Sequence, residues 1–259
     1  MKLAVIIPAY NRVTDVLMAI NSLRAFRACD ETTFHVQDDA SPEANFPALI
    51  PPEVASVARN ATNGGFACNC NNGAATVLDE RAADVLLFCN QDVTAHPQWS
   101  QGWDAALLSA FADPTVGIVG ARLLFPDGSV QNAGGVFDQF AQPVHRCLGW
   151  SNPHMGAASQ AADVEWTTGA ALAVRADLFM RIGGFDERYR MYFEDADLCM
   201  RMRQMGYRVR YEPACTLVHA VGSTGGSPYF PASARRFKAQ WVDTGIVKAG
   251  TMTPQSRYW

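Results

Sequence analysis

The residues best suited to chemistry in this 259-residue chain are a few carboxylates and one histidine, each directly after an apolar run. Asp92 follows Val85-Leu86-Leu87-Phe88-Cys89, and His219 follows a later run. Mg²⁺ and Mn²⁺ bind through one or two carboxylates plus substrate phosphates, and a neutral imidazole can complete such a site. Taken singly, an aspartate after a strand is more often a turn or cap residue, and a lone histidine is usually structural.

A second candidate is the adjacent pair Glu194 and Asp195, which follows Tyr192 and Phe193 and opens a predicted helix. One of these carboxylates could take the proton from an attacking hydroxyl as a general base. The unpaired N–H groups of a helix start lower carboxylate basicity, whereas desolvation by the aromatic rings raises it. The sequence leaves that balance open, and both residues also suit an ordinary first helical turn.

Three further polar segments could recognise a nucleotide or simply form turns. Asp38-Asp39-Ala40-Ser41 follows an apolar run, Asn63-Gly64-Gly65-Phe66 leads into a predicted helix, and Gly222-Ser223-Thr224 comes soon after His219. Carboxylates, amides and exposed backbone N–H groups are the groups that would bind a base and a diphosphate.

The elements that must position these residues alternate between strand and helix in the first half of the chain. Leu3 to Pro8 is apolar without alternation, as in a parallel strand covered on both faces. A helix capped by Thr14 or Asp15 follows. We expect further strands at 34–37, 54–59 and 85–89 and a helix at 66–78. Ligands bind at the carboxyl ends of such strands, where the polar segments lie.

The second half predicts a less regular arrangement. We expect strands at 116–125, 130–137, 170–174 and 209–218, the last interrupted by Pro213, and helices at 195–206 and 232–245. Residues 138–163 lack periodicity and indicate a long excursion or a mobile loop. We therefore predict an α/β fold with one domain over residues 1–245 and a C-terminal tail over 246–259.

Composition limits the classes of function. A net charge of −4 gives no basic excess for binding nucleic acid. The seven cysteines do not form a secreted disulfide pattern, and no apolar stretch is long enough for a signal sequence or membrane span, so we expect a cytoplasmic protein. A basic, aromatic segment could touch a membrane peripherally, although a solvated helix face is the commoner explanation. It comprises Arg235, Arg236, Phe237, Lys238 and Trp241.

Taken in order, these segments resemble the family 2 inverting glycosyltransferases, especially rhamnosyltransferase-like bacterial members, over residues 3 to about 225. The resemblance rests on Ile6-Ile7-Pro8-Ala9-Tyr10-Asn11-Arg12, Asp38-Asp39-Ala40-Ser41, Asn63-Gly64-Gly65-Phe66 with Asn71-Asn72-Gly73, Asn90-Gln91-Asp92, Trp166-Thr167-Thr168-Gly169-Ala170, Gly183-Gly184-Phe185-Asp186-Glu187 and Glu194-Asp195-Ala196-Asp197-Leu198. It implies a GT-A-type nucleotide-diphospho-sugar transferase fold with a mostly parallel central sheet flanked by helices.

The resemblance also implies roles for single residues. Asp195 would be the base and Glu194 would bind acceptor or donor sugar, unless these roles are exchanged. Asp92 and His219 would hold Mg²⁺ or Mn²⁺, and Asp38 would contact a pyrimidine base. The nucleotide-sugar donor would be bound by Pro8, Ala9, Tyr10, Asn11, Asp38, Asn63, Asn71, Asn90, Gln91 and Asp92. The acceptor side would include Trp166, Thr168 and Gly169.

The same resemblance implies a uridine or deoxythymidine diphospho-sugar donor, with rhamnose as one candidate sugar, and a glycan or lipid-linked acceptor in polysaccharide synthesis. One departure is Asn90, which replaces the first carboxylate of the usual Asp-x-Asp element and predicts weak metal affinity. A sugar-nucleotide-binding domain without turnover is an alternative. A nucleotidyltransferase is another, but the loop after the first strand offers only Arg12 as a basic residue and is not a glycine-rich phosphate loop.

Overall fold

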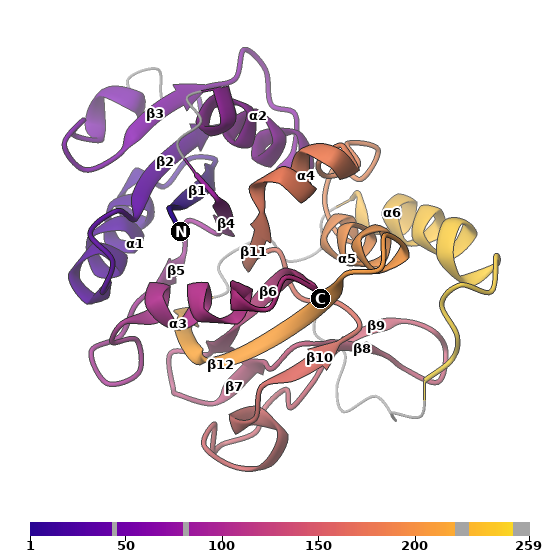
Figure 1. Ribbon diagram of the computed structural model, residues 1–259. Coiled ribbons are helices and arrows are strands. Elements are labelled where there is room, and N and C mark those ends of the chain that lie inside the picture. Colours follow the sequence, from indigo (N-terminus) through magenta and orange to yellow (C-terminus); the bar gives the residue numbers. More distant parts are fainter. Residues whose placement is uncertain (43–45, 80–82, 221–227, 251–259) are drawn as a thin grey trace.

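Four parallel strands form the N-terminal half of the central sheet (Figure 1). The protein is described by a computed structural model over residues 1–42, 46–79, 83–220 and 228–250. The strands lie in the order β3, β2, β1, β4, with parallel pairing throughout. Their bounds are β1 Leu3–Ala9, β2 Thr33–Asp38, β3 Ser56–Arg59 and β4 Val85–Cys89, and the helices between them are α1 Val13–Phe26 and α2 Phe66–Asp79.

The uninterrupted apolar character of β1 is explained by burial on both faces. Ala4 and Ile6 belong to the core cluster that contains α2, whereas Val5 and Ile7 belong to the cluster that contains α1. Side chains alternate between the faces of a strand, so a strand between two helical layers must be apolar at every position. The predicted parallel sheet flanked by helices is confirmed in this half.

The C-terminal half continues the same sheet with mixed pairing. Strand β11 runs antiparallel between β4 and β6, and β12 pairs parallel with β6. The elements are β5 Val93–Thr94, α3 Trp103–Ser109, β6 Val116–Leu124, β7 Val130–Asn132, β8 Gly135–Phe137, β9 Pro143–His145, β10 Ala162–Val164, β11 Ala171–Arg175, α4 Ala176–Ile182, α5 Glu194–Gln204, β12 Arg208–His219 and α6 Phe230–Phe237. The helices α2, α4, α5 and α6 lie on the opposite side of the sheet from α1 and α3 (Figure 1).

Two predicted strands differ in detail from the structure. The predicted strand 130–137 is divided at Gly134, whose φ of 83° breaks the extended backbone, so β7 pairs with β6 and β8 pairs with β9. Pro213 does not interrupt β12 as expected. The strand instead shifts its register against β6 between Glu212 and Thr216, which lets a proline sit within a paired strand.

The segment 138–163 is an ordered excursion, so its interpretation as a mobile loop is corrected. Arg122 is buried and donates from Nη1 to the backbone oxygens of Pro153 and Ala158, at 2.6 and 3.3 Å. The Tyr211 hydroxyl also donates to the Ala158 oxygen, at 2.7 Å. Buried polar side chains from β6 and β12 thus fix a segment whose own sequence has no periodicity.

The C-terminal region departs from two further predictions. Phe237 and Trp241 are each only 2% exposed, so the basic, aromatic membrane surface proposed for this segment is not formed. The described start of the predicted tail is also packed, because Val247 is buried and Gly250 donates its N–H to the Asp138 oxygen. Within the described part of the chain, no helix combines the length and hydropathy needed to cross a membrane.

Candidate active site

The loops after β1, β2 and β4 meet at the carboxyl edge of the parallel strands. The Asn11 N–H donates to the Ser41 hydroxyl oxygen at 2.7 Å, which joins the first two loops. The Tyr10 N–H donates to Gln91 Oε1 at 2.9 Å, which joins the first and third. The Tyr10 side chain itself is 45% exposed at this edge. Parallel strands bring these sequence-distant polar segments together, as the sequence predicts.

The backbone of the first loop is strained where it enters α1. Asn11 and Arg12 both have left-handed conformations, with φ of 59° and 56°. Neither Thr14 nor Asp15 caps the helix as predicted, since Arg12 holds the N-cap position without a side-chain cap and pairs with Asp15. Consecutive non-glycine residues in this region cost free energy and are concentrated at functional loops.

Asp38 is buried beneath this edge. Its side chain has no exposed surface, and its oxygens accept hydrogen bonds from Ser41 and from Arg59 Nη1, the latter at 2.5 Å. Releasing this buried carboxylate would leave its arginine and hydroxyl partners unpaired. The structure thus pairs Asp38 with Arg59, and its contact with a pyrimidine stays a prediction.

Asp39 orders the neighbouring loop, a role that the sequence did not indicate. Its two oxygens accept the N–H groups of Gly64 and Gly65 at 2.8 and 2.9 Å. Gly65 has a φ of +86°, and a Cβ there would lie 2.5 Å from the Arg190 oxygen, so only glycine fits. Asn63 lies in the same loop, where it donates to the Asp39 backbone oxygen and accepts from Arg190.

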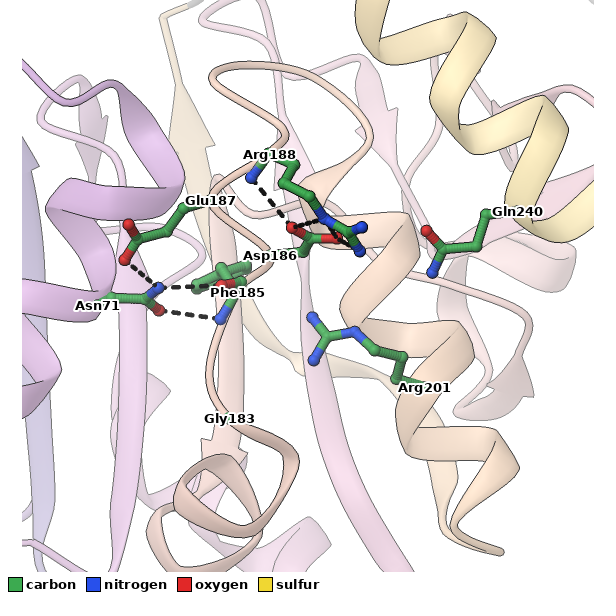
Figure 2. Close-up of a pocket in the computed structure, with 8 residues that line it drawn as sticks. All are labelled: Asn71, Gly183, Phe185, Asp186, Glu187, Arg188, Arg201 and Gln240. Atoms are coloured by element: carbon green, nitrogen blue, oxygen red, sulfur yellow. Dashed lines mark hydrogen bonds and ion pairs between the residues drawn. The ribbon is translucent and has the colours of Figure 1, made fainter.

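Asn71 is likewise engaged by the protein. Its amide donates to the Phe185 oxygen and to Glu187, and its oxygen accepts the Phe185 N–H, all at 2.9 Å. Figure 2 shows these bonds at one side of a cavity of about 380 Å³. The amide therefore attaches α2 to the loop before α5, and its contact with the nucleotide stays a prediction.

The arginines that line this cavity are paired with aspartates. Arg188 pairs with Asp186, as Figure 2 shows, and Arg201 pairs with Asp197 on α5. The cavity thus has no excess of positive charge for a phosphate.

Asp92 and His219 are adjacent, as predicted for a cation site. Strand β5 pairs antiparallel with β12 and aligns Val93 with His219, which brings the two side chains to the same place. His219 Nε2 lies 3.1 Å from Asp92 Oδ1, and each side chain is 13% exposed. A carboxylate oxygen and an imidazole nitrogen this close together are donors that would hold Mg²⁺ or Mn²⁺. The described residues contain no cluster of three or more acidic, histidine or cysteine ligands, so other ligands would come from substrate and water.

Two residues missed in the sequence surround this pair. Gln131 on β7 bonds to His219, and His145 on β9 lies close enough to His219 for their charges to interact. Burial lowers the pKa of His145 to about 4, with a smaller contribution from His219. His145 is therefore neutral at physiological pH and does not repel a cation bound by Asp92. The Gly222-Ser223-Thr224 segment expected beside His219 lies outside the described residues.

A chain of backbone contacts links the cation pair to the Glu194-Asp195 pair. The Asn90 N–H donates to the Ala170 oxygen at 3.0 Å, and the Asn90 amide lies 3.5 Å from His219 Nε2. One residue before Ala170, the Gly169 N–H donates to Asp195 Oδ2 at 2.8 Å. The loop at 168–170 thus connects the two groups of charged residues.

Asp195 is partly exposed and held in one orientation, whereas Glu194 is buried. Asp195 Oδ1 accepts the Ala196 N–H at 2.7 Å, in addition to the Gly169 bond. Glu194 is 6% exposed, and its Oε2 has no hydrogen-bond partner among the described residues. Tyr192 and Phe193 precede them with φ of 70° and 69°, a second strained pair at the site.

The two carboxyls differ in their protonation. Burial, followed by the charge of Asp195, raises the pKa of Glu194 well above its usual range. Burial also raises the pKa of Asp195, but backbone N–H groups including those of Gly169 and Ala196 oppose it. The pKa of Glu194 is thus raised further than that of Asp195, so Glu194 keeps its proton to higher pH than Asp195 does.

Trp166 lies behind the site and not at its surface. Its ring is 1% exposed, and its Nε1 donates to the Val136 oxygen at 3.1 Å. Gly135 packs so closely that a Cβ would lie 2.2 Å from the ring. The burial of this side chain leaves its predicted acceptor contact without support, whereas Gly169 bonds to Asp195.

A family comparison agrees with this geometry. Residues 4–157, more than half of the chain, match the profile described as Glycosyl transferase family 2. The chain belongs to this family. The resemblance stated from the sequence motifs is thereby confirmed.

Curated family 2 relatives are bacterial. The N-acetylglucosaminyl-diphospho-decaprenol L-rhamnosyltransferase of Mycobacterium tuberculosis is 33% identical over 157 residues, covering 56% of this chain and 50% of the relative. Rhamnosyltransferase WbbL of Escherichia coli is 45% identical over 56 residues, or 22% of this chain and 21% of the relative. The chain thus spans half or less of the length of these relatives.

Solved glycosyltransferases share the GT-A fold of this family 2 chain. GalNAc-T7, solved with UDP, GalNAc and Mn²⁺, has a TM-score of 0.70 at 16% identity and covers 93% of this chain and 48% of its own. The mannosyltransferase PcManGT of Pyrobaculum calidifontis, solved with GDP-Man and Mn²⁺, has a TM-score of 0.62 at 21% identity, with coverages of 97% and 66%. At these identities the likeness establishes the fold alone.

Proposed function

We propose that this protein is an inverting glycosyltransferase that moves a sugar from a uridine or deoxythymidine diphosphate donor to a hydroxyl of a glycan or lipid-linked acceptor. The names of the rhamnosyltransferase relatives favour rhamnose as the sugar and polysaccharide synthesis as the setting. The observation that carries the proposal is the location of a restrained, charged Asp195 on the same connected edge as the Asp92–His219 pair.

The donor lies along the loops that this edge brings together. Pro8, Ala9, Tyr10 and Asn11 line the nucleoside, with Tyr10 offering an exposed ring for stacking. Gln91 accepts the Tyr10 N–H and so holds the Tyr10 backbone in place. Asn63 donates to the Asp39 backbone oxygen and so fixes the loop that contains Gly64 and Gly65. A divalent cation held by Asp92 and His219, beside Asn90, would supply the positive charge that stabilises a departing diphosphate.

Asp195 is the general base of the proposed reaction. The acceptor oxygen forms a bond to the anomeric carbon, the bond from that carbon to the diphosphate oxygen breaks, and the acceptor proton passes to Asp195. The leaving diphosphate keeps the electron pair of the broken bond. Attack opposite the leaving group inverts the anomeric centre. Gly169 fixes one oxygen of Asp195 through its N–H, so the carboxylate need not be ordered during the reaction.

Glu194 contacts the sugar in the proposed reaction. Because it is neutral, it does not add a second negative charge beside the base, and its hydroxyl can donate to a sugar oxygen. The burial of Glu194 and the partial exposure of Asp195 support this division of roles, because a substrate hydroxyl reaches the exposed carboxylate more readily.

Replacing Asp195 with asparagine tests the proposal. The Asp195→Asn variant keeps the side-chain shape but removes the base, so transfer should fall by about 10²- to 10⁴-fold. Binding of UDP or dTDP in the presence of Mn²⁺, measured by calorimetry, should change little. Asp177→Asn is the matched control, because Asp177 is an exposed aspartate in the first turn of α4.

Undiminished transfer by Asp195→Asn would refute the assignment of the base. Nucleotide-sugar binding without transfer by the wild-type chain, across uridine and deoxythymidine donors and lipid-linked acceptors, would instead favour a binding domain that lacks turnover.

A further inference from the structure

Gln131 contacts His219 through both halves of its amide. His219 Nδ1 and Gln131 Oε1 lie 2.6 Å apart, and Gln131 Nε2 lies 3.2 Å from the backbone oxygen of the same histidine. Gln131 is only 8% exposed. It is placed by the sheet, because its strand β7 pairs with β6 and β6 pairs with β12.

These two contacts determine where the imidazole proton lies. A backbone carbonyl oxygen can only accept a hydrogen bond, so the amide nitrogen of Gln131 must face it. The amide oxygen must then face Nδ1, and because that oxygen also only accepts, Nδ1 must carry a hydrogen. The lone pair of a neutral His219 is consequently on Nε2, the atom 3.1 Å from Asp92 Oδ1.

We propose that Gln131 is a positioning residue that fixes the tautomer and ring orientation of His219 so that Nε2 can bind the cation. This inference rests on the proposed function, because it concerns the cation of the donor site. Histidine ligands hold a metal well when their second ring nitrogen donates to a fixed acceptor, and loss of that acceptor typically lowers metal affinity about 10- to 100-fold.

Gln131 makes two contacts with His219, and the second contact fixes the orientation of the amide. The amide nitrogen of Gln131 bonds to the backbone oxygen of His219 while the amide oxygen faces Nδ1. The amide therefore cannot flip and present its nitrogen to Nδ1. A turned amide would place two oxygens 3.2 Å apart and would favour the opposite tautomer, in which Nε2 carries the hydrogen and cannot bind a metal.

Mn²⁺ binding to the full chain tests the role of Gln131. Free Mn²⁺ is measured by electron paramagnetic resonance during titration of the chain with Mn²⁺ in the presence of UDP or dTDP. Gln131→Leu removes the acceptor and should weaken Mn²⁺ binding about 10- to 100-fold. Gln131→Glu restores an acceptor for the Nδ1 hydrogen and should bind closer to wild type than Gln131→Leu does. Gln101→Leu, at an exposed glutamine, is the control and should bind as wild type.

Equal Mn²⁺ affinity of Gln131→Leu and wild type would overturn the proposal. So would equally weak binding by the Leu and Glu variants when both unfold at the wild-type midpoint, because a purely structural glutamine makes no distinction between an acceptor and an alkyl group.

Imidazole ¹⁵N chemical shifts provide a readout that needs neither donor nor cation. Asp92 Oδ1, 3.1 Å from Nε2, is a competing acceptor in the metal-free chain, so the shifts are measured in the Asp92→Ala background at alkaline pH. There His219 should have hydrogen on Nδ1 and a bare Nε2, with its signals assigned by their loss when His219 is also replaced by alanine, and adding Gln131→Leu should give a mixture of tautomers. A His219 with hydrogen on Nε2 in Asp92→Ala would refute the inference. Absence of transfer combined with the expected shifts and Mn²⁺ binding would refute the proposed function and leave the role of Gln131 intact.

Discussion

The two pairs of adjacent carboxylates at this edge have opposite environments. Asp38 and Asp39, at the end of β2, accept hydrogen bonds from an arginine, two glycine N–H groups and neighbouring side chains. Glu194 and Asp195, at the start of α5, have fewer partners, and one Glu194 oxygen has none among the described residues. Asp38 and Asp39, whose oxygens are occupied by hydrogen bonds, therefore hold the loops of the site in place. Glu194 and Asp195, which have fewer partners, can still exchange protons.

If Asp38 is structural, removing its partner should have the largest effect on stability. Arg59→Ala leaves a fully buried carboxylate without its cation. We expect a loss of about 3 kcal/mol in the free energy of unfolding, at the low end for buried pairs because Arg59 is partly exposed. Urea denaturation measures it. Lys238→Ala, which breaks an exposed pair with Asp243, should change stability by less than about 0.5 kcal/mol. Similar small losses for both variants would contradict the structural role.

A smaller loss is expected for Asp39→Asn. An asparagine keeps one acceptor oxygen but turns an NH₂ group toward one of the Gly64 and Gly65 N–H donors. The lost charge-assisted bond should cost about 2 kcal/mol of stability. Because the glycine loop would also loosen, nucleotide binding measured by calorimetry should weaken. Unchanged binding in a destabilised protein would show that this loop does not contact the donor.

We expect Glu194→Gln to change the free energy of unfolding least, when it is measured at low pH. Glutamine is neutral and has the shape of a protonated glutamate. The raised pKa of Glu194 means that the folded state holds a proton that the unfolded state releases above about pH 4.3. Wild-type stability should therefore fall as pH rises from there toward the folded pKa, and this loss should be smaller in the variant, where Asp195, whose pKa is also raised by burial, still contributes. Denaturation midpoints of both proteins across that range test this, and parallel pH profiles would contradict a neutral Glu194.

Much of the parallel half of the fold was predictable because its signals are local. Apolar runs such as Leu3 to Pro8 predict buried strands, and the topology of such sheets places their polar ends together. The meeting of Asp92 and His219 was predicted through the family resemblance. The physical reason for it is the pairing of β5 with β12, which no local pattern shows.

The sequence did not reveal side-chain environments that are formed by distant parts of the chain. Asp38 is buried because Arg59, at the end of another strand, covers it. Trp166 is buried because Gly135 leaves room for its ring. Gln131 gave no signal, since it lies in an expected strand and acquires its role only when β6 places it beside β12. These are contacts of the folded chain, and periodicity carries no information about them.

The most direct test of the account is the cation dependence of sugar transfer. The wild-type chain, supplied with uridine or deoxythymidine diphospho-sugars and a glycan or lipid-linked acceptor, should release nucleotide diphosphate and form product with Mn²⁺ or Mg²⁺. Activity should fall to background with chelator. Asp92→Ala should lower it at least about 10-fold, while Asp127→Ala, in an exposed turn, should not. Transfer that persists with chelator and in Asp92→Ala would contradict the account.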